Sequence, residues 1–342
     1  MQNYIHDNYY ILNIRDCKIN FNINIFKNME TTTEGNFEDD LKIDNYVNFE
    51  YKKRKILSEK IQKAYEKINI NKATRLALCF TRLEFYKKYS VNKITDERLK
   101  KELKLIFANS CRVRLCPSCA WRRSLKVYAN NKKIISEVFK ENKVNKFIFL
   151  TLTLKNCPGE KLKDTITILL NAFNYMTRRK NIKNAWKGYI RNLEVTYNNK
   201  TKTFHPHLHI ISWVSNSYYN KGIYITQKEY TKMFQEIAKI DYIPIVNVKK
   251  ADEGAIPEIS KYCLKYSDII NLPDEELVEV IKILDDALDS RRALSYGFKL
   301  KEIKQKLKLK DEITEGEEIE ENMEEFGYKI IYNWFYDKYE RI

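Results

Sequence analysis

The hydrophobic residues of the chain follow two periods, and each period predicts one type of element. Runs with a two-residue period, or with continuous β-branched and aromatic content, predict strands, whereas apolar residues three and four apart predict amphipathic helices. The predicted strands are 73–86, 147–154, 189–197, 205–214 and 243–250. The predicted helices are 51–72, 120–141, 164–179, 226–240 and a helix that Pro257 opens and that continues to Ile270.

The clearest part of this pattern lies between residues 147 and 214. The strand FIFLTLTL and the turn Pro158-Gly159 precede an amphipathic helix for which Asp164 is the expected N-cap. The apolar face of this helix is formed by Ile166, Leu169, Leu170, Phe173 and Met176. The polar loop NNKTKTF then joins two strands in a predicted hairpin. With the later elements, this order predicts an α+β fold with an antiparallel sheet and helices on one face.

Composition divides the chain into four predicted segments. Residues 1–72 form an accessory N-terminal segment that is Asn-rich and irregular up to residue 50. Residues 73–142 are rich in cysteine and basic residues, 143–270 contain the predicted sheet, and 271–342 form a helical region that is first basic and then acidic. The 24 Tyr and 16 Phe among 342 residues supply ample core-forming side chains, which excludes a mostly disordered protein.

The sequence gives no sign of a membrane segment. No apolar run approaches the roughly 18 residues that a spanning helix needs. The N-terminal residues have neither the basic region nor the apolar region of a signal peptide. We therefore expect a cytoplasmic protein without a membrane partner.

The positive charge is concentrated in the middle of the chain. The formal net charge is +16, yet acidic residues exceed basic ones by five in residues 1–50 and by eight in 311–342, so residues 51–310 carry +29. The densest windows are 111–136, with seven bases and no acid, and 291–310, with eight bases, one acid and helical spacing. Such a field attracts polyanions, most often nucleic acid, although a Lys-rich solvated surface is the alternative. The acidic stretch that follows is either a solvated linker or a cover for basic surface.

Three of the four histidines fall within five residues, namely His205, His207 and His209. Alternate side chains of a strand share a face, so His207 and His209 lie about 7 Å apart on one face and can converge on a divalent ion. A His-rich surface strand is the alternative. Glu194 is the candidate third ligand, because a hairpin whose paired residue numbers sum to 401 or 403 places it opposite His207 or His209. A one-residue slip would place it on the other face.

Glu258, Tyr262 and Tyr266 are spaced four residues apart, so on a helix they lie along one stripe with Lys261 and Lys265 beside it. Free tyrosine, with a pKa near 10, is a poor nucleophile, and a nearby metal or lysine favours its phenolate. A carboxylate one turn away can activate water as a general base. In a chain with 24 tyrosines, the spacing alone also fits an ordinary amphipathic helix.

Cys111, Cys116 and Cys119 have a spacing typical of a zinc knuckle. Disulfides are disfavoured in a cytoplasmic chain, and tetrahedral zinc needs a fourth ligand. Cys79, in a predicted strand some 30 residues upstream, is the candidate. Reduced and partly buried thiols are the alternative. The remaining cysteines are expected to be packing residues: Cys17, Cys157 and Cys263.

Together these stretches resemble the replication (Rep) proteins of small rolling-circle plasmids of Gram-positive bacteria, which belong to the HUH endonuclease superfamily. The resemblance is carried by CRVRLCPSCAWRR, by FLTLTL with the helix after it, and by LEVTYN, FHPHLHII and EISKYCLKYSD. It covers roughly residues 75–270. The ordered set is specific, whereas any one stretch is not.

The resemblance implies an HUH-type nicking domain in residues 143–270 and a DNA-binding, zinc-binding element in residues 73–142. It implies that His207 and His209 are paired ligands of Mg²⁺ or Mn²⁺. Tyr262 is the implied nucleophile, which leaves a 5′-phosphotyrosine link and a 3′-OH primer, and Tyr266 is a second candidate. Glu258 is implied to activate water for the terminating cleavage.

The implied partners are the plasmid double-strand origin, single-stranded or extruded at the nick site, and a host helicase and polymerase. Basic residues near the motifs are expected to bind the DNA. These residues are Arg112, Arg114, Arg122, Arg123, Lys126, Lys261 and Lys265.

Three other functions explain part of the sequence. A relaxase or single-strand transposase of the same superfamily fits less well, because of the cysteine knuckle and the pairing of Glu258 with Tyr262. A zinc-containing nucleic-acid-binding protein without cleavage activity explains the charge and the cysteines but not the histidines with Glu194. A metal-dependent hydrolase of small substrates explains the histidines but not the +29 of residues 51–310.

Overall fold

The computed structural model describes residues 10–14, 17–21, 36–91, 98–142, 145–219, 222–252, 254–311 and 327–342. Its contacts divide the chain into two compact units, one formed by Met1–Ala120 with Ile313–Ile342 and the other by Trp121–Glu312. The predicted segment boundaries after residues 72, 142 and 270 do not coincide with this division, and the four-segment organisation stays a prediction. Among the described residues, no helix combines the length and the apolar character needed to cross a membrane.

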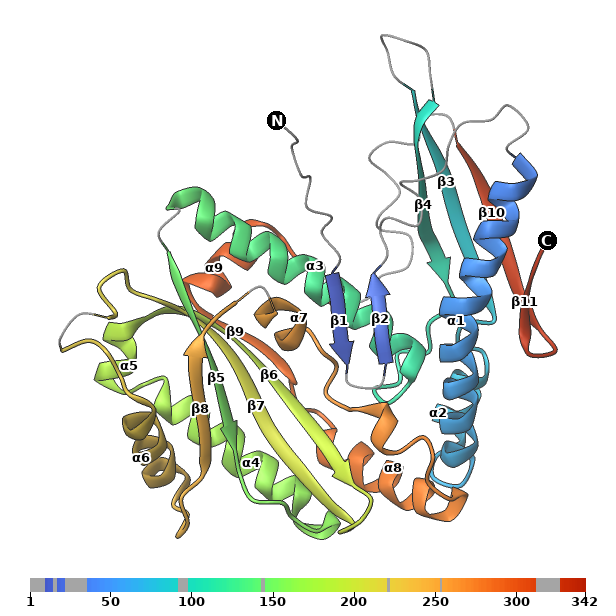
Figure 1. Ribbon diagram of the computed structural model, residues 1–342. Helices are drawn as coiled ribbons and strands as arrows, with labels where there is room; N and C mark the ends of the chain where they lie inside the picture. Colours follow the sequence, from blue (N-terminus) through green and yellow to red (C-terminus); the bar gives the residue numbers. More distant parts are fainter. Residues whose placement is uncertain are drawn as a thin grey trace. The chain divides into compact units, whose positions relative to one another are not determined.

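The unit Trp121–Glu312 is built on a five-stranded antiparallel sheet with the strand order β8-β5-β7-β6-β9 (Figure 1). Its strands are β5 (Lys146–Thr153), β6 (Trp186–Asn198), β7 (Thr203–Val214), β8 (Ile245–Lys250) and β9 (Leu294–Phe298). The first four lie within three residues of their predicted bounds. The predicted α+β class and the predicted antiparallel sheet are therefore confirmed.

The hairpin of β6 and β7 has one of the two registers expected from the sequence. Glu194 lies opposite His207, and Asn192 lies opposite His209, so the paired numbers sum to 401. Because side chains alternate between the faces of a strand, all four residues project from the same face of the sheet.

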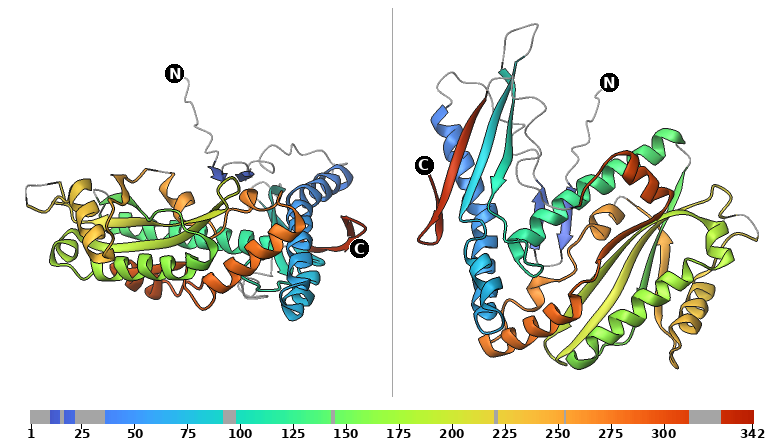
Figure 2. Two further views of the ribbon diagram at one scale, coloured as in Figure 1. Left: turned by 90° about the horizontal axis from the view of Figure 1, so that it is seen from below. Right: turned by 180° about the vertical axis from the view of Figure 1, so that it is seen from behind.

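Helices cover both faces of this sheet, so the prediction of helices on one face is wrong. The face with the histidines packs against α3 (Pro117–Glu141), α7 (Ala255–Ile259) and α9 (Lys299–Lys306). The opposite face packs against α4 (Gly159–Met176), which lies along the sheet in the view from behind (Figure 2). The reason is visible in β7, which is buried without interruption from Pro206 to Val214 and needs cover on both sides. The unit also contains α5 (Lys180–Ala185), α6 (Gln227–Ala238) and α8 (Asp274–Leu288).

The predicted helix from Pro257 to Ile270 is wrong. Helix α7 ends at Ile259, and beyond it only the 3-10 turn Tyr266–Asp268 is helical up to Ile270. The chain between them pairs with β6, where the Val195 N–H donates to the Cys263 carbonyl at 2.8 Å. This long-range backbone bond replaces the local bonds of a helix, so the predicted stripe of one carboxylate and two tyrosines does not form.

Two further boundaries differ from the prediction. Helix α4 begins at Gly159, with Pro158 and not Asp164 at the N-cap position. In residues 291–310 only α9 is helical, because Leu294–Phe298 form the edge strand β9 on β6. Gly297 allows this pairing, since a Cβ atom there would collide with the ring of Tyr189.

The unit formed by the two ends of the chain contains a second antiparallel sheet, with the order β11-β10-β3-β4. Its strands are β3 (Arg82–Val91), β4 (Arg98–Ala108), β10 (Gly327–Phe335) and β11 (Lys338–Arg341), and its helices are α1 (Asn36–Glu66) and α2 (Ile70–Ala77). The ring of Phe85 packs edge-to-face against Tyr51 of α1 and Tyr332 of β10. A separate hairpin pairs β1 (Tyr10–Ile14) with β2 (Cys17–Phe21).

This unit corrects three predictions. Residues 73–77 of the predicted strand 73–86 belong to α2, whose N-cap Asn69 accepts a hydrogen bond from the Lys72 N–H at 3.0 Å. The supposedly irregular N-terminal segment is helical from residue 36. The predicted helical C-terminal region ends instead in two strands, because β10 pairs with the distant β3. Most of the predicted acidic stretch, residues 312–326, lies outside the described residues.

Candidate metal centre, tyrosine segment and cysteine cluster

Glu194 of β6 and His207 and His209 of β7 converge on one point of the sheet. Oε2 of Glu194 lies 3.1 Å from Nε2 of His207 and 2.9 Å from Nε2 of His209. All three side chains are buried, and ligand atoms from the three lie within 4.8 Å of one another. The structure thus brings together the three predicted ligands, whereas His205 lies outside this group.

Contacts on the far side of each imidazole orient it toward Glu194. Nδ1 of His207 donates to the His205 carbonyl at 3.2 Å, and Nδ1 of His209 lies 3.4 Å from Oγ1 of Thr151. A carbonyl can only accept, so Nδ1 of His207 carries a proton while its Nε2 faces the carboxylate. A proton or a cation must lie between Nε2 and the carboxylate oxygen, because otherwise two acceptors would meet. Two imidazoles and a carboxylate form a donor set that suits a divalent cation.

The protonation state of Glu194 supports the same use. Burial raises the pKa of Glu194, but hydrogen bonds from His207 and His209 and their charge outweigh burial and hold the pKa well below its usual value. The carboxylate is therefore ionised at neutral pH, which is the form that binds a cation.

Glu258 reaches this cluster from α7. Its Oε1 lies 3.5 Å from Nε2 of His209, and its Oε2 lies 2.6 Å from the ammonium of Lys261. The Glu258 side chain is 32% exposed, compared with 9% for that of Glu194. The Glu194 carboxylate is therefore enclosed by the histidines, while the Glu258 carboxylate borders the cluster and remains open to water.

Tyr262 lies in the non-helical segment after α7, and hydrogen bonds to β6 hold this segment on both sides of the tyrosine. Nδ2 of Asn192 donates to the Lys261 carbonyl at 2.7 Å, and the N–H of Val195 donates to the Cys263 carbonyl at 2.8 Å. Because β6 also carries the candidate carboxylate ligand, a single strand positions that ligand and the candidate nucleophile.

Tyr266, the second predicted tyrosine, is placed differently. It begins the 3-10 turn Tyr266–Asp268, and its hydroxyl oxygen is buried. Tyr262 is half-buried. The two tyrosines therefore differ in local structure, because Tyr266 begins a 3-10 turn and buries its hydroxyl oxygen, whereas Tyr262 lies in the non-helical segment held by β6.

The four predicted cysteine ligands also come together. Sγ of Cys119 lies 3.6 Å from those of Cys79 and Cys111, and Sγ of Cys116 lies 3.6 Å from that of Cys79. All four are buried, and a disulfide would require about 2.05 Å between sulfur atoms. A zinc tetrahedron with Zn–S bonds of about 2.3 Å has edges of about 3.8 Å, so the arrangement fits zinc.

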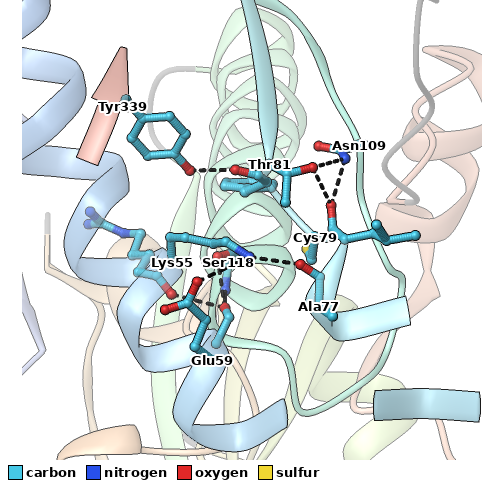
Figure 3. A network of polar contacts seen from close by, with 12 residues as sticks. Lys55, Glu59, Ala77, Cys79, Thr81, Asn109, Ser118 and Tyr339 are labelled. Atoms are coloured by element: carbon cyan, nitrogen blue, oxygen red, sulfur yellow. Dashed lines mark hydrogen bonds and ion pairs between the residues drawn. The ribbon is translucent and has the colours of Figure 1, made fainter. Parts of the chain in front are cut away.

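Cys79 lies in the turn after α2 and not in the predicted strand, and three side chains from distant parts of the sequence fix this turn (Figure 3). The buried ammonium of Lys55 donates to the Ala77 carbonyl at 3.0 Å. Nδ2 of Asn109 donates to the Leu78 carbonyl at 2.6 Å, and the Tyr339 hydroxyl donates to the Phe80 carbonyl at 2.6 Å. These bonds hold Cys79 beside the knuckle despite the separation in sequence.

The predicted DNA-binding residues fall into three groups. Arg112 and Arg114 lie in the cysteine loop, and Arg112 is exposed. Arg122, Arg123 and Lys126 lie on α3, where the guanidinium of Arg123 is 5.9 Å from the ring centre of Tyr262. The third group, Lys261 and Lys265, flanks Tyr262, and each lysine forms an ion pair, with Glu258 and Asp268 respectively.

Two residues of the site were not predicted from the sequence, Asn192 and Thr151. Asn192 stands two residues before Glu194, so the two-residue period of the strand already places both on one face. A second polar residue on the face of Glu194 was the available signal. Thr151 had no such signal, because only the pairing of β5 with β7 sets it opposite His209.

The fold and the site together define an α+β protein with an antiparallel sheet and two groups of residues that could bind a metal. Comparison with known proteins then identifies it more closely. The family model described as "Replication protein" matches residues 102–341, and the chain belongs to this replication protein (Rep) family.

Relatives of the chain include proteins named "Protein rep" from several Gram-positive bacteria. The one from Bacillus amyloliquefaciens is 34% identical over 290 residues, which cover 77% of this chain and 82% of the relative. That from Lactiplantibacillus plantarum is 34% identical over 293 residues, covering 79% and 91%. That from Streptococcus pneumoniae serotype 2 is 34% identical over 266 residues, covering 75% and 79%. No solved structure matches the chain.

Proposed function

We propose that this protein initiates rolling-circle replication of a plasmid by nicking one strand at the double-strand origin. The observation that supports this most directly is the joint placement on β6 of Glu194, which meets His207 and His209, and of the hydrogen bonds that hold the segment of Tyr262. Membership of the replication protein family supplies the biological context. The sheet, the histidine pair and the tyrosine agree with an HUH-type nicking domain.

Glu194, His207 and His209 hold Mg²⁺ or Mn²⁺ in this proposal. Two imidazoles and an ionised carboxylate are the donors, and their ligand atoms already face one another. When bound, the ion supplies Lewis-acid polarisation of the scissile phosphate.

Tyr262 is the nucleophile. Its phenol oxygen attacks the phosphorus in line with the departing 3′ oxygen, so a phosphotyrosine bond forms as the P–O3′ bond breaks. The phenol loses its proton and the departing oxygen gains one, which leaves a free 3′-OH primer and a 5′-phosphotyrosine link. The hydrogen bonds from Asn192 and Val195 hold the segment in place before reaction, which is the condition for efficient attack.

Glu258 serves the terminating cleavage. Its partly exposed carboxylate borders His209 and Lys261, so it can accept a proton from a water molecule that attacks the regenerated junction. Water then takes the place that Tyr262 takes in initiation.

The cysteine cluster binds a structural Zn²⁺ and shapes the loop that carries Arg112 and Arg114. These arginines and the basic residues of α3 and of the tyrosine segment contact origin DNA, which is single-stranded or extruded at the nick. The 3′-OH passes to a host polymerase, and a host helicase opens the duplex ahead of it. All of these steps take place in the cytoplasm.

The test is covalent adduct formation on a single-stranded origin oligonucleotide with Mn²⁺, followed by mapping of the attached 5′ end. The wild-type protein forms an adduct, whereas Tyr262→Phe and His207→Ala do not. Tyr266→Phe is the matched control and retains the adduct.

An adduct formed by Tyr262→Phe would overturn the nucleophile assignment, and cleavage by His207→Ala would overturn the metal site. DNA binding by the wild-type protein without any adduct would favour a non-cleaving nucleic-acid-binding protein.

A further inference from the structure

His205, the third histidine of the cluster, lines a pocket of about 660 Å³ beside the candidate metal centre. Its ring centre lies 5.3 Å from that of His207. Two residues along a strand span roughly 7 Å, so the pocket and the histidine pair are neighbours on β7. The lining also includes Lys265, three residues after Tyr262. The pocket therefore adjoins both the candidate ligands and the segment of the candidate nucleophile.

The lining of this pocket combines hydrogen-bonding and aromatic groups. Asn156 and Asn271 offer amide donors and acceptors, and His205 offers a ring. Among the described residues, the Asn271 side chain has no hydrogen-bond partner, so its amide is available to a ligand. The volume lies within the range of pockets that bind small ligands.

The charges in the pocket suit a nucleotide better than a free anion or an apolar ligand. Asp268 already accepts from the ammonium of Lys265 at 3.0 Å and from the hydroxyl of Ser267 at 3.2 Å, so its negative charge is paired within the protein. The exposed ammonium of Lys200 has no ionic partner within the described part of the chain, and it can meet a phosphate. Unstacked bases are recognised by stacking on aromatic or histidine rings and by hydrogen bonds to their edges.

We propose that this pocket binds the unstacked nucleobase of one nucleotide next to the scissile phosphate, with His205 as the ring beside the base and Asn271 as the amide at its edge. The pocket would thereby select the nucleotide at one position of the nick site. This inference rests on the proposed function, because it takes single-stranded origin DNA as the ligand.

The experiment uses the full chain and a series of origin oligonucleotides, each with one abasic position near the nick. With the wild-type protein, removal of the base at one position next to the nick lowers the rate of adduct formation by about 10- to 100-fold. This is the loss expected for one stacked base. Asn271→Trp, which fills the pocket, lowers the rate on intact DNA by a similar factor but adds no loss when that same position is abasic. Asn171→Trp, at an exposed site on α4, is the matched control and behaves as wild type.

Two results would overturn the pocket. One is wild-type cleavage of intact DNA by both Asn271→Trp and His205→Ala. The other is a rate of adduct formation by Asn271→Trp that is lower than that of the wild type by the same factor on every abasic oligonucleotide. If the wild-type protein forms no adduct at all, the proposed nicking function fails, and fluorescence anisotropy of the same oligonucleotides then decides the pocket separately. Weaker binding of the oligonucleotide that lacks the base at one particular position supports the pocket. Equal affinity for every abasic oligonucleotide refutes the pocket.

Discussion

Asn192 offers the sharpest test of how the tyrosine is positioned. Its side chain is 3% exposed, and its Nδ2 donates to the Lys261 carbonyl at 2.7 Å. Asn192→Leu keeps the approximate volume but leaves that carbonyl without its donor. The hydrogen bond from Val195 to Cys263 remains, so the substitution removes the hydrogen bond to β6 on one side of Tyr262 and keeps that on the other.

The magnitude follows from the burial of this bond. An unsatisfied buried acceptor costs about 1–3 kcal/mol. If that free energy is lost from the docked state of the segment, its docking equilibrium falls by about 5- to 150-fold, since each 1.4 kcal/mol is about a factor of ten. We therefore expect the rate of adduct formation at saturating DNA to fall by about 10- to 100-fold, while Mn²⁺ affinity stays within about a factor of two because the ligands are unchanged.

Asn145→Leu is the matched control. Nδ2 of Asn145 also donates to a backbone carbonyl, that of Val138, at 2.7 Å, and its side chain is also buried, but it lies outside the candidate site. Both variants lower the free energy of unfolding, and only Asn192→Leu lowers the single-turnover rate of the folded protein. Equal nicking rates for the two folded variants would show that Asn192 is merely structural and does not position Tyr262.

Two further outcomes test other parts of the molecule. Cys79→Ser reduces bound zinc from about one per chain to none by elemental analysis and lowers the melting midpoint by at least about 5 °C. Cys157→Ser is the control and keeps the zinc. Zinc retained by Cys79→Ser would contradict the four-cysteine site. Burial raises the pKa of Glu84, but hydrogen bonds from Lys329 and Arg82 lower it by more, so its folded pKa lies below the ordinary 4.5. The wild type therefore has a larger free energy of unfolding than Glu84→Gln at neutral pH, and this difference shrinks as the pH falls below about 4.5. Denaturant titrations at several pH values measure the difference. A difference that stays constant with pH would contradict the prediction.

Local patterns in the sequence were sufficient for the candidate metal ligands. The two-residue period of β6 and β7 and the short polar loop between them fix which residues share a face and leave few registers. One of the two expected registers is the one observed, with Glu194 opposite His207. The knuckle spacing likewise identified three cysteines that the structure brings together, and Cys79, the candidate fourth ligand some 30 residues upstream, joins them.

The tyrosine segment shows where local reasoning fails. Its four-residue spacing is that of a helix, yet Lys261 and Cys263 give their carbonyl groups to β6 and α7 ends at Ile259. A residue's neighbours in sequence do not reveal a competing partner some 70 positions away. The second sheet was missed for the same reason, because β10 pairs with β3, which lies more than 200 residues earlier in the sequence.

The sequence by itself therefore determined the chemistry available to this protein: two imidazoles and a carboxylate on one face of a hairpin, a group of thiols, and a strongly basic middle. Side-chain periodicity and residue type are local properties, so they can be read along the chain. Only the tertiary structure decided which amide holds the tyrosine segment, and that His205 lines a pocket outside the group of Glu194, His207 and His209. These depend on backbone and side-chain partners that are distant in sequence, and on which groups the packed core leaves open to water.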